Sequence, residues 1–308
     1  MALTLLKDIR RIYAGLNADE IRGAAYHALK VGLMAASEAG YAEMERFLVP
    51  LWLDDRARAD ALRSVQRLDG LPANNFDFVL CTDGVPLPHN GYQFNPADPD
   101  SVAKAIIAGH SALELAIGRN FPLFRRAAAD RIINRISREN ALFSLVTALP
   151  NVIPSVIDLP WAVGEFATDT AFLTMNQIRM ALLMAALHGQ TVGYGDQKAQ
   201  IAVIAAGAFG WRALARELVG KIPLGAGLIP KAAVAFAGTY VVGMGLDKLN
   251  RTGAGLSRLE KKDAYAKAFE KGKEVMSELA PNVAKRDGTH AQASPDATET
   301  DPPAVIRD

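Results

Sequence analysis

The chain has 308 residues and a formal net charge of +1; half of its residues are apolar and 22% are charged. This composition excludes wholesale disorder, and the near-zero charge points to neither a nucleic-acid partner nor a strongly acidic one. Aromatic residues make up only 7%, so most apolar surface comes from Ala, Leu, Ile and Val, as in closely packed helices. The single cysteine, Cys81, excludes an internal disulfide and a cysteine-based metal cage.

The first 70 residues have the pattern of a helical region. Apolar residues recur at helical spacing over 3–14, and the early basic residues follow the first apolar ones, which is not the order of an export signal. A second helix is predicted over 17–37, with Asn17 as its N-cap. Two more helices are expected near 41–53 and 55–69.

Residues 71–100 are rich in Gly and Pro, which is typical of turns, and we interpret them as an irregular linker. The one strand-like run is Phe76–Cys81, and a single short run cannot form an independent sheet. Helices are then predicted from Asp98 and Pro99 to about Ile117 and over 122–140. The sequence therefore predicts an all-α fold, a multi-helix bundle with at most one short strand-like segment.

Residues 141–246 form an apolar, Ala/Gly-rich half, with 11 charged residues among 106. Helices are expected over 161–189, 198–219 and 230–248, after a bent or re-entrant hairpin broken by Pro150 and Pro154. No stretch reaches the roughly 18–20 uninterrupted apolar residues of a standard transmembrane helix. The sequence leaves two alternatives open, a membrane domain and a very apolar soluble core.

Small residues recur every four positions in these three predicted helices. Each set lies along one helix face, which favours close helix packing of the kind common in membranes. The abundance of Ala and Gly in this half is the alternative explanation. The nine residues are Ala181, Ala185, Gly189, Ala202, Ala206, Gly210, Ala235, Thr239 and Gly243.

A basic stripe lies on the predicted helix 122–140, just before the apolar half. Arg131, Arg135 and Arg138 share one face of it. Positive charge beside an apolar segment is typical of the cytoplasmic edge of a membrane, where anionic lipid attracts it. The alternative is a partner contact or an ordinary solvated helix face. No aromatic residues interleave with these arginines, so the stripe does not indicate nucleic-acid binding.

A polar stripe is predicted on the helix 161–189, formed by Glu165, Asp169, Asn176 and Arg179. Carboxylates beside an arginine in an apolar segment are candidates for proton transfer or partner anchoring. The alternative is a water-facing stripe with a structural carboxylate–arginine link.

Residues 254–280 contain a predicted amphipathic helix that docks on the core or lies at an interface, and residues 281–308 have the composition of a disordered tail. Ser257 and Glu260 have the spacing of a capping box. The expected apolar face of this helix comprises Leu259, Ala266, Phe269, Met276 and Leu279.

The sequence carries no motif for a cofactor, a metal or a nucleophile. Gly220-Lys221 and Gly272-Lys273 lack the Ser or Thr and the spacing of a phosphate loop. The five histidines include no pair at metal-ligand spacing, and nothing near Cys81 in the sequence lowers the pKa of its thiol. We therefore expect a protein that is not an enzyme.

Residues 120–250 resemble a bacterial family known as domain of unknown function six-nine-seven. The most specific part is Leu173-Thr174-Met175-Asn176-Gln177 before an Ala-rich helix that ends at Gly189. Other segments of the likeness are Arg131–Ile133, Asn140-Ala141, Ala148–Pro150, Asp169, Met180 and Lys221–Pro223. The resemblance implies a membrane-associated domain that often follows a small GTPase domain, which residues 1–120 do not provide.

The sequence thus predicts a central helical domain over 101–253 in a helical accessory protein. Its expected partners are membrane lipid, a membrane protein, a separate GTPase or a second copy of the chain, and its expected location is the cytoplasmic side of a membrane. The alternative is a soluble cytoplasmic helical scaffold or homo-oligomeric interaction protein.

Overall fold

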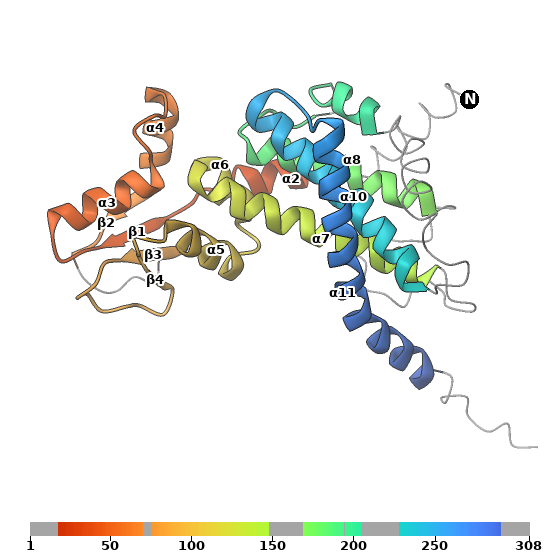
Figure 1. Cartoon of the computed structure of the whole chain (residues 1–308). Helices are drawn as coiled ribbons and strands as arrows, with labels where there is room; N and C mark the ends of the chain where they lie inside the picture. The colour runs from red at the N-terminus through yellow and green to blue at the C-terminus, as the bar shows by residue number, and fades with distance from the viewer. Residues whose placement is uncertain (1–17, 70–74, 148–168, 194, 205–227, 291–308) are drawn as a thin grey trace, which may run out of the picture.

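The computed structural model describes residues 18–69, 75–147, 169–193, 195–204 and 228–290. A small parallel sheet with its helices forms one side of the molecule, and long helices form the other (Figure 1). The short helices α5 (Pro99–Gly109) and α6 (Glu114–Asn120) lie between the two parts.

The sheet has four parallel strands in the order β2-β1-β3-β4. The strands are β1 (Val31–Met34), β2 (Val65–Arg67), β3 (Phe78–Cys81) and β4 (Gly91–Gln93). In the central pair, Val31 lies opposite Phe78 and Met34 opposite Cys81. The helices α3 (Glu38–Leu48) and α4 (Asp55–Leu62) connect β1 to β2. The fold is therefore mixed α/β, followed by a helical C-terminal region.

The prediction of an all-α fold was wrong for a physical reason. Every residue of β1 and β3 is buried, so neither strand shows the alternation that marks a half-exposed strand. Four apolar residues in a row fit a helix equally well. The outer strands β2 and β4 have three residues each and mixed polarity. In place of the helix predicted over 17–37, α2 (Ala18–Ala25) ends before β1 begins.

The two faces of the sheet are covered differently. Val31, Leu33, Phe78 and Leu80 join the main hydrophobic core, whereas Met34, Val79 and Cys81 belong to a separate small cluster. That second cluster is covered by partly buried side chains from connecting segments. They are Leu68, Phe76 and Val85. One face is thus the interior of the protein, and the other is sheltered mainly by loops.

The predicted start at Asp98 is confirmed. The Asp98 carboxylate accepts a hydrogen bond from the amide of Ser101 over 3.1 Å, and Pro99 occupies the first turn of α5. The chain then forms α6 and a short 3-10 turn, η1 (Pro122–Phe124), before the long helix α7 (Arg125–Val146).

The helical region consists of α7, α8 (Asp169–Leu187), α10 (Leu228–Thr252) and α11 (Arg258–His290), and residues 198–204 are also helical. Helix α10 packs against α7, α8 and α11, so it is the central helix of this region. In Figure 1 it runs beside α11, and α7 crosses close to both.

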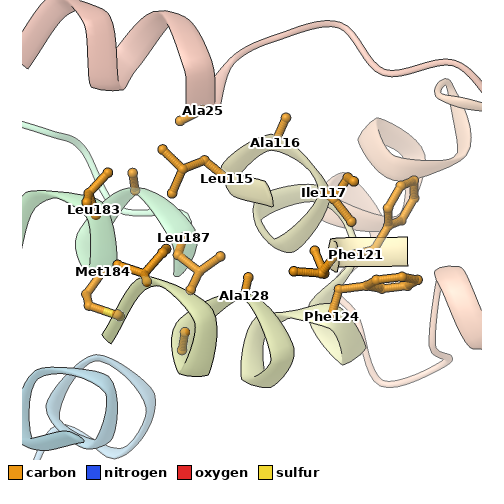
Figure 2. Close-up of a cluster of buried hydrophobic side chains, with 14 of the residues drawn as sticks. Ala25, Leu115, Ala116, Ile117, Phe121, Phe124, Ala128, Leu183, Met184 and Leu187 are labelled. Carbon is orange, nitrogen blue, oxygen red and sulfur yellow. The ribbon is translucent and has the colours of Figure 1, made fainter. Parts of the chain in front are cut away.

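The main core is continuous from the sheet into the helical region. Figure 2 shows the part where α6, η1, α7 and α8 meet, with Ala25 of α2 at its edge. At its centre α6 and α8 approach closely, since a Cβ on Gly118 would lie 2.3 Å from the Cδ1 of Leu187. This shared core connects the α/β part to the long helices.

Candidate functional site

The predicted basic stripe is largely occupied by contacts within the protein. Glu114 of α6 is only 3% exposed, and its carboxylate accepts a hydrogen bond from Arg135 over 2.6 Å. Arg131 lies 3.3 Å from the other carboxylate oxygen. Arg138 is exposed. Two of the three arginines therefore neutralise a buried carboxylate.

Two neighbouring arginines also have structural roles. Arg119 donates hydrogen bonds to the carbonyls of Ala186 and Gln190 at the end of α8, where a helix favours positive charge. Arg125 donates to the carbonyl of Gly118 over 3.1 Å, and burial lowers the pKa of its guanidinium. These contacts connect α6, α7 and α8.

The predicted polar stripe does not form one site among the described side chains. Glu165 lies outside the described residues, and Asp169 is the first residue of α8, with its side chain outside the described part. Asn176 and Arg179 contact different partners on α7. Arg179 lies 3.3 Å from Glu139, and burial raises the pKa of Glu139 while this arginine opposes the rise.

Asn176 belongs to a buried polar network that joins three helices. Its Nδ2 donates to the Oδ1 of Asn140 over 2.7 Å. The Nδ2 of Asn140 donates to the Oγ1 of Thr239 over 2.8 Å. All three side chains are at most 1% exposed. Polar groups that satisfy one another inside an apolar core fix the register of the helices, because other alignments leave them unpaired.

The Oδ1 of Asn176 and the hydroxyl of Ser137 are buried with no hydrogen-bond partner among the described residues. Asn176 contacts Asn140 directly, and Ser137 lies about one turn before Asn140 on α7. The sequence placed Asn176 in the predicted polar stripe and Thr239 in a small-residue row, and neither prediction paired them with Asn140. An Asn in the apolar part of a long helix was the available signal.

The three small-residue rows differ in how far they are buried. Ala181 and Ala185 are buried in α8, whereas Gly189 follows the helix at a φ of +81°. The amide of Gln190 donates to the carbonyl of Ala185, so Gly189 ends α8 in the left-handed conformation that glycine adopts without strain. Ala202 is exposed, and Ala206 and Gly210 lie outside the described residues.

On α10, Gly243 is a point of close helix contact. A Cβ at this position would lie 2.7 Å from a side-chain atom of Ile133 on α7 and 2.9 Å from the sulfur of Met180 on α8. Thr239 is buried in the polar network, and Ala235 is half-buried. This row therefore faces the interior at two of its three positions.

Sequence reasoning missed a further row on α11. Ala264, Ala268 and Gly272 recur every four residues and are buried, and a Cβ on Gly272 would lie 3.2 Å from the backbone of Ala233 on α10. The predicted apolar face was partly wrong. Met276 is fully buried, but Leu259 is 81% exposed and Ala266 is exposed.

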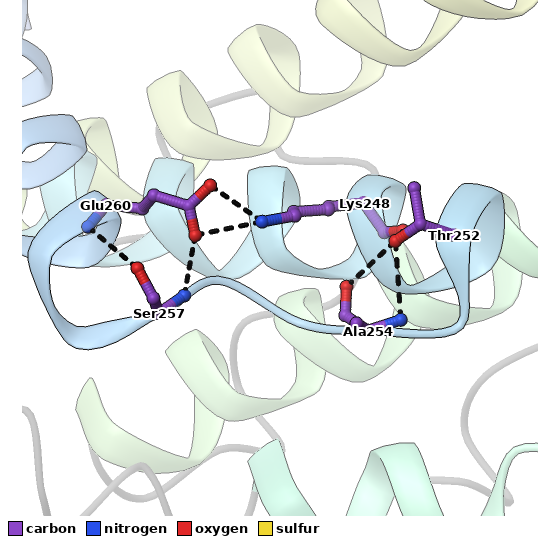
Figure 3. Close-up of polar contacts among 5 residues, drawn as sticks. All are labelled: Lys248, Thr252, Ala254, Ser257 and Glu260. Atoms are coloured by element: carbon purple, nitrogen blue, oxygen red, sulfur yellow. Dashed lines mark hydrogen bonds and ion pairs between the residues drawn. The ribbon is translucent and has the colours of Figure 1, made fainter.

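The start of α11 agrees with the predicted capping box (Figure 3). The Glu260 carboxylate accepts from the amide of Ser257 over 2.7 Å, and the Ser257 hydroxyl accepts from the amide of Glu260 over 3.3 Å. Lys248 near the end of α10 donates to both Glu260 oxygens, over 2.6 and 2.9 Å. These contacts lower the pKa of Glu260 to about 2, chiefly through Lys248.

Two further titratable candidates, His188 and Cys81, lie in different parts of the fold. The Nε2 of His188 lies 3.0 Å from Asp247, which links the end of α8 to α10. Cys81 is fully buried in β3, and burial raises the pKa of its thiol. Among the described residues, no group of three or more His, Cys, Asp or Glu side chains is placed to hold a metal ion.

Comparison with known proteins gave no match to this chain among family models, curated proteins or solved structures. The resemblance of residues 120–250 to a GTPase-associated family therefore stays a prediction.

Proposed function

We propose that this chain is a non-catalytic accessory protein that acts through protein contacts, with its helical region as a water-exposed scaffold around α10. The observation that carries the proposal is the position of Lys271 on α11. Its ammonium lies 5.2 Å from the ring centroid of Tyr240, near the middle of α10, and donates to Asn134 of α7 over 2.6 Å. A charged group is thus held beside the midpoint of the apolar helix.

This position bears directly on membrane insertion. A charged side chain at the middle of a bilayer costs about 2.5–3.5 kcal/mol on insertion scales. If α10 crossed a membrane in this arrangement, α7 and α11 would enter the hydrocarbon beside it. Lys267 and Lys271 of α11 are exposed, and so is Arg138 of α7. These three charged side chains are more stable in water than in lipid.

Membrane association is the second candidate, and one observation favours it. The segment Ile229–Thr252 is long and apolar enough to cross a bilayer, and 44% of its apolar window is buried by the rest of the protein. The same properties fit the central helix of a soluble bundle. The two candidates differ in what contacts the part of α10 that this chain does not bury. Membrane association places lipid there, and the scaffold proposal places another protein there.

Cell fractionation with a matched substitution separates the two candidates. Gly238 is near the middle of α10, and a Cβ there would have no neighbour within 4 Å. We expect the unmodified chain and Gly238→Lys to stay in the supernatant without detergent. Recovery of the unmodified chain in the carbonate-washed pellet, with release by Gly238→Lys, would establish membrane insertion and overturn the scaffold proposal.

Ala237→Lys is the control for this experiment. Ala237 is fully buried against α11, so a lysine there should unfold the helical region whether α10 lies in a membrane or in water.

Light scattering of the purified chain gives its mass and so tests the predicted homo-oligomer. A separate GTPase remains a proposed partner on the strength of the resemblance alone.

A further inference from the structure

A cavity of about 650 Å³ opens at the carboxyl edge of the sheet, away from the helical region. Its lining comes from the segments that follow three different strands. Met34 ends β1 and Ala35–Glu38 follow it, Leu68 and Asp69 follow β2, and Val85 and Pro86 follow β3. Its size is within the roughly 300–1,000 Å³ usual for small-molecule sites.

The sheet topology favours a ligand site at this edge. From β1 the chain passes to β2 on one side, whereas from β3 it passes to β4 on the other side. Neighbouring parallel strands whose connections diverge in this way leave a crevice outside their carboxyl ends, where open α/β sheets bind ligands. The cavity lies at this divergence between β1 and β3. The Thr82 amide, directly after β3, donates to the Met34 carbonyl over 3.0 Å, so the two strands stay hydrogen-bonded up to their carboxyl ends.

The turn from β1 into α3 has small residues at the three glycine positions of a dinucleotide-binding turn. They are Ala35, Ser37 and Gly40, in the spacing small-x-small-x-x-Gly. The third position has the expected physical role, since a Cβ on Gly40 would lie 2.9 Å from Thr82 and 3.1 Å from Ala35. Glycine there permits close packing of α3 on the loop after β3.

The other two positions argue against a diphosphate. Side chains at Ala35 and Ser37 occupy the space through which the backbone would approach a pyrophosphate. The Ser37 hydroxyl already accepts from the amide of Gly40 over 3.2 Å, and Glu38 adds a negative charge in the first turn of α3. Arg67, the last residue of β2, is held by Glu38 and Glu45 over 2.8 and 2.7 Å. This end of α3 is thus already neutralised.

The rest of the cavity lining fits an uncharged ring with hydroxyl groups. Met34, Leu68, Val85 and Pro86 supply apolar surface, while Asp69, two residues after β2, supplies a carboxylate. A carboxylate at the end of the second strand is the group that accepts ribose hydroxyls in dinucleotide-binding folds. We propose that this cavity binds a ribonucleoside, with the base against the apolar side and the ribose diol on Asp69.

The test uses the full chain and ligand-observed NMR with adenosine, guanosine, cytidine and uridine, followed by titration calorimetry of any that bind. We expect at least one ribonucleoside to bind. Its 2′,3′-dideoxy analogue should bind about tenfold or more weakly, as should the unmodified ribonucleoside with Asp69→Asn, since a hydrogen bond to a charged group is lost in each case. The 5′-monophosphate should also bind more weakly than the nucleoside, because Glu38 and Asp69 repel it.

Two variants locate the binding. Ala36 is exposed and lines the cavity, so Ala36→Trp should fill it and abolish binding without disturbing the core. Glu43→Gln, on the same helix as Glu38 but outside the lining, should bind like the unmodified chain. The proposal fails if no ribonucleoside binds, if binding survives Ala36→Trp, or if the monophosphate binds more tightly than the nucleoside.

Discussion

The Nδ2 of Asn140 donates a hydrogen bond to the Oγ1 of Thr239 over 2.8 Å, and both side chains are buried between α7 and α10. The Thr239 hydroxyl donates its only proton to the carbonyl of Ala235 over 2.9 Å. It can therefore only accept from Asn140. The direction of every bond in the network follows from this, including the donation from Asn176 to the Oδ1 of Asn140.

Thr239→Val should destabilise the protein by about 1–3 kcal/mol, because it leaves a buried amide proton of Asn140 without its acceptor. The free energy of unfolding from chemical denaturation measures this loss. Thr252→Val is the matched control, since Thr252 makes the same contact to the carbonyl four residues earlier but is exposed. Equal losses in the two variants would show that the network adds no stability.

Glu114→Gln should also destabilise the protein. It removes the negative charge that Arg131 and Arg135 share inside the protein, and loss of one partner from a buried ion pair costs several kcal/mol. Both arginines are more than a third exposed, so solvent screening reduces the expected cost to about 1–3 kcal/mol. Asp263→Asn, which removes the exposed partner of Lys267, should cost below about 0.5 kcal/mol. If Glu114→Gln lowered the free energy of unfolding as little as Asp263→Asn does, the structural role of the ion pair would be contradicted.

Gly243→Ala and Gly238→Ala should move stability in opposite directions. Alanine in place of an interior helix glycine stabilises a helix by about 0.5–1 kcal/mol when the space is free, as at Gly238. At Gly243 the new methyl group would press on Ile133 and Met180, so we expect a net loss of about 1–3 kcal/mol. Thermal unfolding of the two variants measures the difference. A stabilising Gly243→Ala would mean that α10 lies farther from α7 and α8 than described.

The capping contact of α11 should depend on pH through Glu260. Its folded-state pKa, about 2, lies below the ordinary value of 4.5, so the ionised form stabilises the folded state above pH 4.5. This stabilisation should disappear as the pH falls from about 4.5 to about 2. Glu260→Gln should therefore lower stability at pH 7 and make no difference near pH 2. A difference between the two proteins that stays constant over this range would exclude the contact with Lys248.

Local contacts were predictable from the sequence, and contacts across the chain were not. The caps at Asp98 and Ser257 depend on residues three positions apart, and both predictions are confirmed. A helix face can be read from spacing, but its partner cannot. The arginines of α7 bind a carboxylate on another helix, about 20 positions earlier in the chain. The sheet was missed because the two neighbours of β1 lie far along the chain, β2 beyond α3 and α4 and β3 after β2.

The one thiol of this chain is fully buried at the end of β3, one of the two inner strands of the sheet. Because no second cysteine competes, a thiol reagent can modify the protein only when Cys81 becomes accessible, through opening of the sheet or of the loops that cover this face. The native chain therefore carries its own reporter of α/β stability, with no label or substitution required. Modification rates measured beside the helical signal in circular dichroism would tell whether the sheet and the long helices open together or separately.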